Sequence, residues 1–126
     1  MDYEKKKVLV IDDNTDICDL VERTLKGVEF EVFKASSGKE GITIAKEQKP
    51  DVILLDIMMP EIDGFITSSF IKKIPDTENI PIVFLTARKT TKGLTLALKA
   101  GAEDYITKPF SPKDLLKRLR RVLDAR

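Results

Sequence analysis

The chain has 126 residues, of which 34% are charged, and its basic and acidic side chains nearly cancel to a formal net charge of +1. This length suits one domain with a buried core, so we expect residues 1–126 to form a single domain. A chain without a strong overall charge has no general attraction for nucleic acid or anionic membranes, and we expect direct binding to neither. The single cysteine and the absence of histidine exclude an internal disulfide, the common zinc sites and histidine general bases.

The sequence carries no targeting or membrane-spanning signal. No run approaches the roughly 18 apolar residues that a spanning helix needs, and the polar first residues do not resemble a signal peptide. We therefore expect a cytoplasmic protein, in which carboxylates and lysine carry any chemistry.

Apolar runs of strand length alternate with segments of helical period along the whole chain. Strands are expected at residues 7–11, 30–34, 51–55, 81–85 and 104–107, and a helix is expected after each of them. Runs such as 52–55, which are apolar at every position, indicate strands covered by helices on both faces, whereas the mixed run 30–34 indicates an edge strand. The pattern predicts an α/β fold with a doubly wound parallel sheet of five strands and five helices.

The first and last helices have clear apolar faces. Asn14 or Thr15 can cap the start of the first helix. Its apolar stripe comprises Ile17, Leu20, Val21, Thr24 and Leu25. The stripe of the last helix comprises Leu115, Leu116, Leu119, Val122 and Leu123, and its basic residues Lys113, Lys117, Arg120 and Arg121 are interpreted as a solvated face rather than a nucleic-acid site.

Acidic residues follow two of the expected strands. Asp12 and Asp13 come after the first strand, and Asp56 comes after the third. Each position has an ordinary explanation, since acidic residues are common in turns and at helix starts. In doubly wound folds, however, ligands bind at the carboxyl ends of the strands, where these residues would meet. Three crowded carboxylates repel one another without a counter-ion, and Mg²⁺ is the cation that best suits such oxygen ligands.

Two further strand ends supply groups that can contact a phosphoryl group. Lys108, after the fifth strand, offers a compact ammonium, and Thr86, at the fourth, offers a hydroxyl. Pro109 permits a cis peptide bond that would direct Lys108 inward. In the loop after the third strand, Gly64 favours a turn and Asp63 can cap the next helix.

Four motifs occur in a specific order along the chain. They are Val10–Asn14, Asp51–Pro60 followed by Asp63 and Gly64, Pro81–Ala87, and Ala100–Phe110. Together they resemble the receiver domain of response regulators in two-component signalling, the CheY-like family, over essentially the whole length. The resemblance implies a flavodoxin-like sheet with strand order 2-1-3-4-5 and five helices.

The resemblance also implies roles for the residues at the strand ends. Asp56 would be the phosphoacceptor, and Asp13, Asp56 and the backbone oxygen of Met58 would bind Mg²⁺ directly. Asp12 would hold a water of the metal. Lys108 would pair with Asp56 or with its phosphoryl group.

Further implied roles concern switching and partners. Thr86 and Tyr105 would be the switch pair, because a phosphoryl group can draw in the Thr86 hydroxyl and leave space for the Tyr105 ring. The resemblance implies a phosphohistidine donor, and because the chain lacks histidine this donor would be a partner protein, a histidine kinase or a phosphotransfer protein. The residues implied in its docking are Ile17, Leu20, Pro109 and Phe110. A downstream protein, or an output domain of the same protein, would bind the side formed by the fourth helix, the fifth strand and the fifth helix.

Three apolar residues stand where typical relatives have charged ones. Leu96 lies in the expected fourth helix, and Ile66 and Phe70 lie four residues apart in the third. Our hypothesis is that Leu96 belongs to a phosphorylation-dependent partner or dimer surface, and that Ile66 and Phe70 form a second contact. The alternative is that these are isolated exposed apolar residues without a role.

The sequence as a whole predicts a phosphoacceptor switch with slow self-hydrolysis, not an enzyme acting on a separate substrate. Two alternatives stay open, a receiver fragment of a longer regulator and a binding module that works without phosphorylation. An aspartyl-phosphate phosphatase is disfavoured because Met58 stands where that class needs a second aspartate. A flavodoxin-like cofactor protein is disfavoured because no Gly/Ser/Thr-rich phosphate loop follows the first strand.

Overall fold

The structure, a computed structural model, describes residues 5–26, 29–87, 99 and 101–125. Its strands are β1 (Lys6–Ile11), β2 (Phe30–Ala35), β3 (Val52–Asp56), β4 (Ile82–Thr86) and β5 (Asp104–Thr107). Its helices are α1 (Thr15–Leu25), α2 (Gly38–Gln48), α3 (Gly64–Lys73) and α5 (Pro112–Asp124). All five expected strands are therefore present, with boundaries within one residue of the expected ones. The fourth expected helix falls on residues 88–98 and 100, outside the described residues.

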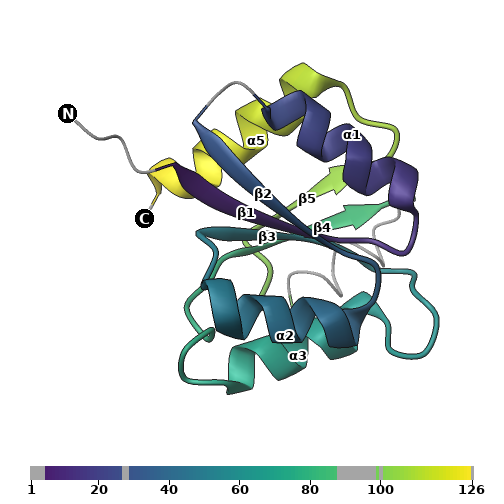
Figure 1. Ribbon diagram of the computed structural model, residues 1–126, viewed down its shortest axis with the longest axis vertical. Coiled ribbons are helices and arrows are strands. Elements are labelled where there is room, and N and C mark those ends of the chain that lie inside the picture. Colours follow the sequence, from purple (N-terminus) through teal and green to yellow (C-terminus); the bar gives the residue numbers. More distant parts are fainter. Residues whose placement is uncertain (1–4, 27–28, 88–98, 100, 126) are drawn as a thin grey trace.

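The five strands form one parallel sheet in the order β2-β1-β3-β4-β5. Helices α1 and α5 cover one face of the sheet, and α2 and α3 cover the other (Figure 1). The doubly wound fold and the edge position of β2 are thus confirmed. The strand order reverses at β1 and β3, and in such folds this is where a ligand site is expected.

Alternate residues of each central strand enter two separate cores. In β1, Val8 and Val10 belong to the core beneath α1 and α5, whereas Leu9 and Ile11 belong to the core beneath α2 and α3. Strands β3 and β4 alternate in the same way, and their apolar side chains are fully buried. Burial on both faces explains why these strands are apolar at nearly every position.

The helices begin at side chains that cap them. The Asn14 side chain accepts a hydrogen bond from the Asp16 backbone N–H at 2.9 Å, and Asp63 accepts one from the Ile66 N–H at 2.9 Å. The buried face of α5 is the expected one, but that of α1 is centred on Cys18, Val21 and Leu25, which leaves Leu20 half-buried at its margin. No helix within the described ranges is long and apolar enough to cross a membrane.

The central strands should dominate the stability of the fold. Replacing the fully buried Leu54 by alanine removes packing from the core beneath α1 and α5, and should lower the free energy of unfolding by about 2–5 kcal/mol. Urea denaturation followed by circular dichroism measures this change. Ile66→Ala, at an exposed aliphatic position on α3, is the matched control and should change stability by less than about 1 kcal/mol. Equal losses in both variants would contradict this account of the core.

Candidate functional site

The register of the sheet brings the predicted strand-end residues to one edge. Ile11 pairs with Leu55 across β1 and β3, so Asp12 leaves the sheet beside Asp56. Thr86 pairs with Thr107 across β4 and β5, and Lys108 follows directly. Parallel strands place their carboxyl ends at the same edge, and the sequence-predicted acidic residues and Lys108 therefore meet there.

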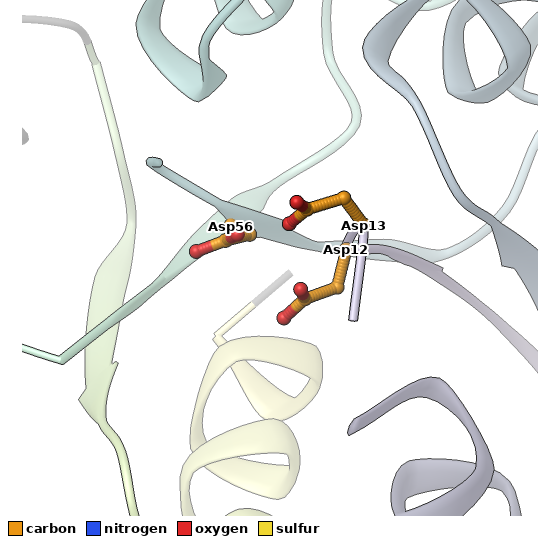
Figure 2. A group of neighbouring side chains, drawn as sticks. All are labelled: Asp12, Asp13 and Asp56. Carbon is orange, nitrogen blue, oxygen red and sulfur yellow. The ribbon is translucent and has the colours of Figure 1, made fainter. Parts of the chain in front are cut away.

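Three carboxylates form a compact group at this edge. One carboxylate oxygen from each of Asp12, Asp13 and Asp56 lies within 4.8 Å of the others. Asp12 and Asp13 extend from the end of β1 toward Asp56 (Figure 2). Asp12 is fully buried, Asp56 is 5% exposed and Asp13 is exposed. The group is closed toward the sheet and open to solvent on the Asp13 side.

Lys108 reaches into this group from the end of β5. Its Nζ lies 2.6 Å from Oδ2 of Asp12 and 3.3 Å from Oδ1 of Asp56. Asp12 is held further by the backbone N–H of Asn14, which donates to Oδ1 at 2.9 Å. The Lys108–Pro109 peptide bond is cis. The expected pairing of Lys108 with Asp56 is present, but Asp12 is the nearer partner, which the sequence did not indicate.

The surroundings of Asp56 disfavour its charged form. Burial raises the pKa of the Asp56 carboxyl from its ordinary value of 3.8 to about 6, and the nearby Asp12 charge adds to the rise. The Lys108 ammonium and a hydrogen bond from the Met58 backbone lower the pKa in part. Even with its cationic neighbour, the charged form of Asp56 is therefore less favoured here than in water.

Lys108 stays charged in this environment. Burial lowers the pKa of its ammonium, but the hydrogen bond to Asp12 and the charges of Asp12 and Asp56 outweigh burial and leave the pKa raised. A cation with oxygen ligands would relieve the remaining repulsion among the carboxylates. Three carboxylates, one of them open to water, fit a hard divalent cation that keeps part of its hydration shell. Mg²⁺ is such a cation.

The predicted switch residues lie on one face of the sheet. Phe84 pairs with Tyr105, and both pack in the core beneath α2 and α3. Thr86 follows Phe84 by two residues, so its side chain leaves β4 on that same face. Thr86 and Tyr105 are both half-buried. Thr86 thus stands at the carboxyl end of β4, and Tyr105 lies level with Phe84, two positions before that end, on the same face of the sheet.

The structure adds two residues that the sequence did not single out. The guanidinium of Arg118 on α5 lies 5.8 Å from the centre of the Tyr105 ring and donates to Oδ1 of Asp104 at 2.9 Å. The backbone N–H of Tyr105 donates to the same oxygen at 2.8 Å. Only the adjacency of Asp104 and Tyr105 in the sequence could have suggested this cluster.

The predicted partner residues differ in how much they contribute to the core. Ile17 and Phe110 are half-buried and pack against the core beneath α1 and α5. Leu20 is half-buried and Pro109 is exposed. Residues 106–110, with Asp114 and Arg118, line a surface pocket of about 360 Å³.

Two of the three unusual apolar residues are visible in the structure. Ile66 and Phe70 are 43% and 53% exposed, as the sequence predicted, and they lie on α3. Leu96 lies outside the described residues, so the hypothesis about it stays a prediction.

Comparison with known proteins gives a consistent result. The family model of the response regulator receiver domain matches residues 8–120. The probable transcriptional regulator ycf27 of Cyanophora paradoxa is 40% identical over 123 residues, which cover 98% of this chain and 50% of that protein. The DNA-binding response regulator MtrA of Mycobacterium bovis is 35% identical over 120 residues, covering 95% of this chain and 51% of that protein. The chain thus spans about half the length of these curated relatives.

Solved structures share the whole fold. The chemotaxis protein CheY4 of Vibrio cholerae is 34% identical with a TM-score of 0.90, covering 94% of this chain and 99% of that one. The receiver domain of a sensor histidine kinase from Pseudomonas aeruginosa, described with a magnesium ion coordinated in its active site cleft, is 28% identical with a TM-score of 0.87, covering 95% and 98%. Motif order, strand topology and these matches agree, and the chain belongs to the response regulator receiver domain family of two-component signalling.

Proposed function

We propose that residues 1–126 act as one receiver domain in which Asp56 accepts a phosphoryl group from the phosphohistidine of a partner protein. The observation that carries this proposal is the convergence of three carboxylates and Lys108 at the carboxyl edge of the sheet. Phosphoryl transfer requires mainly alignment and neutralisation of charge on the phosphoryl oxygens, and this edge supplies groups for both.

In the proposed reaction, a carboxylate oxygen of Asp56 attacks the phosphorus atom and forms a P–O bond. The P–N bond to the donor imidazole breaks, and its electron pair stays on the imidazole nitrogen. Asp56 thereby becomes an acyl phosphate. Lys108, already 3.3 Å from Asp56, remains charged and stabilises the phosphoryl oxygens.

The residues assigned to magnesium are those of the acidic group. Asp13, Asp56 and the backbone oxygen of Met58 would bind the ion directly, and Asp12 would hold one of its waters. When bound, Mg²⁺ neutralises negative charge on the phosphoryl oxygens. The raised pKa of Asp56 supports this assignment, because a carboxyl that resists ionisation by itself gains from a nearby cation.

The product of the proposed reaction is the phosphorylated chain itself and not a released metabolite. We therefore propose a switch with slow self-hydrolysis instead of an enzyme with a separate substrate. The phosphoryl group adds about −1.5 to −2 charge and three acceptor oxygens. The Thr86 hydroxyl would turn toward these oxygens, and Tyr105 would follow on the same sheet face. The signal would pass to a downstream protein or an output domain through β5, α5 and the expected fourth helix, which carries Leu96.

The final output differs between the named relatives and is not determined by this domain alone. MtrA is a DNA-binding response regulator by name, and CheY4 is a chemotaxis protein. The chain would serve either as a shuttle or as the receiver part of a longer regulator. Our expectation that this domain itself does not contact nucleic acid or membrane stays a prediction from its near-neutral charge, as does the cytoplasmic location.

The phosphoacceptor assignment can be tested directly. Incubation with acetyl phosphate and Mg²⁺ should add one phosphoryl group to the wild-type chain, and the intact mass will show it. Asp56→Asn should gain none, because the amide lacks the nucleophilic oxygen. Asp76→Asn, the same change at an exposed position, should behave as wild type. A wild-type chain that never gains the group would favour the binding module that works without phosphorylation.

The burial of the Asp56 carboxyl, together with the nearby Asp12 charge, predicts a pH-dependent difference in stability. Because the pKa of Asp56 is higher in the folded than in the unfolded chain, its stabilising contribution is fully present below about pH 4 and is lost as the pH rises through about 6. In metal-free buffer, Asp56→Asn should therefore match wild type below pH 4 and exceed it above pH 6. The expected gain is on the order of 2–3 kcal/mol by urea denaturation. A gain that does not depend on pH would contradict the stated cause.

Docking of the donor on α1 predicts a difference between donors. Leu20 lies at the margin of the core, so Leu20→Asp should leave the fold and the reaction with acetyl phosphate unchanged. Transfer from a phosphorylated histidine phosphotransfer domain that is active on wild type should slow by about tenfold. Thr43→Asp, at an exposed position on α2, is the control. Equal slowing with both donors would place the effect of Leu20 in the site instead of the docking surface.

A further inference from the structure

Helix α3 begins directly against the peptide group that follows the proposed phosphoacceptor. Gly64 is the first residue of α3 and is buried. Its backbone N–H donates to the carbonyl oxygen of Ile57 at 2.8 Å, which closes the loop of residues 58–63 on itself. The position of the first turn of α3 is thereby tied to the backbone at Asp56 and Ile57.

The space at Gly64 is filled by that backbone. A methyl group on Gly64 would overlap with the carbonyl oxygen of Asp56, and would lie 2.8 Å from Cα of Ile57 and 2.9 Å from the carbonyl carbon of Asp56. The φ angle of Gly64 is not positive, unlike that of Gly101. Close approach, and not an unusual backbone conformation, is therefore what requires glycine at this position.

We propose that Gly64 is a positioning residue for phosphoryl transfer. Its missing side chain lets α3 hold the Asp56–Ile57 peptide where the Asp56 carboxylate meets Lys108 and the aspartates at the end of β1. The same contact sets the start of the loop that carries the Met58 carbonyl. This inference rests on the proposed function of Asp56.

Neighbouring strands leave little freedom to absorb an extra methyl group. Strand β3 pairs with β1 on one side and β4 on the other, and the Ile57 N–H donates to the carbonyl oxygen of Leu85 at 3.2 Å. The clash must therefore rotate the Asp56–Ile57 peptide or push α3 outward with its loop. Either movement changes the direction of the Asp56 carboxylate or the position of the Met58 carbonyl. A misplacement of about 1 Å can cost roughly 100-fold in rate.

Gly38 on α2 provides a matched control. It is also buried, and a methyl group there would overlap with Oγ1 of Thr67 and lie 2.8 Å from two side-chain carbons of Ile62. These are side-chain atoms of the loop before α3 and of α3 itself, and no backbone atom of Asp56 is among them. Gly38→Ala therefore crowds the same layer without pressing on the phosphoacceptor.

The experiment compares wild type, Gly64→Ala and Gly38→Ala. Circular dichroism and urea denaturation report the fold, electron paramagnetic resonance reports Mn²⁺ binding, and intact mass reports the rate of phosphoryl gain from acetyl phosphate with Mg²⁺. Both variants should be less stable than wild type. Gly64→Ala alone should gain phosphoryl about 10- to 100-fold more slowly and bind Mn²⁺ more weakly. Amide NMR shifts that change at Asp56 to Met58 only in this variant would support the stated displacement.

Three other outcomes would count against the inference or against the proposed function. If Gly64→Ala matches Gly38→Ala in both phosphoryl gain and Mn²⁺ binding, the inference is overturned. If wild type gains no phosphoryl group, the proposed function fails, and the Mn²⁺ comparison still tests the role of Gly64. If Gly64→Ala does not fold, the measurements are repeated with trimethylamine oxide, which favours the compact state. Failure to fold there, while Gly38→Ala folds, would make Gly64 a residue of folding and would overturn the inference.

Discussion

The crowding of negative charge at the carboxyl edge of the sheet is the constraint on which the rest of this structure depends. Asp12 and Asp56 are almost fully buried and lie close to Asp13, and burial together with the nearby Asp12 charge raises the pKa of the Asp56 carboxyl. Lys108 offsets part of this repulsion through the short contact with Asp12 and the longer one with Asp56. The negative charge that Lys108 does not neutralise is why we propose that a divalent cation binds at this edge.

The packing around the acidic group keeps this unfavourable arrangement in place. Strands β1 and β3 are buried on both faces, so the residues at their ends cannot separate without disturbing two cores at once. Gly64 brings α3 against the Asp56 backbone, and Asn14 holds the Asp12 carboxylate at the start of α1. Stability from the apolar layers thus offsets local electrostatic strain. Farther along the sheet, the guanidinium of Arg118 on α5 lies over the Tyr105 ring.

Much of this could be predicted from local patterns. Short apolar runs predicted the positions of the strands, and a mixed composition predicted which strand lies at the edge. Central strands are buried on both faces and are apolar throughout, whereas a less buried edge strand also carries polar residues. The meeting of Asp12, Asp56 and Lys108 followed from parallel strands ending at a common edge. The sequence did not predict two features. The buried face of α1 is centred on Cys18, and Lys108 lies closer to Asp12 than to Asp56. Both depend on side-chain contacts across elements that lie far apart in the sequence.

By itself, the sequence determined the α/β class, the order of the strands through the family resemblance, and which residues stand at the strand ends. These properties are local, because periodicity and turn chemistry are set by neighbouring residues. Tertiary structure alone decided the distances among the carboxylates, the burial that raises the pKa of Asp56, and the contact that requires glycine at position 64. Such properties arise only when distant segments are brought together, since desolvation and steric exclusion depend on what each group touches in space.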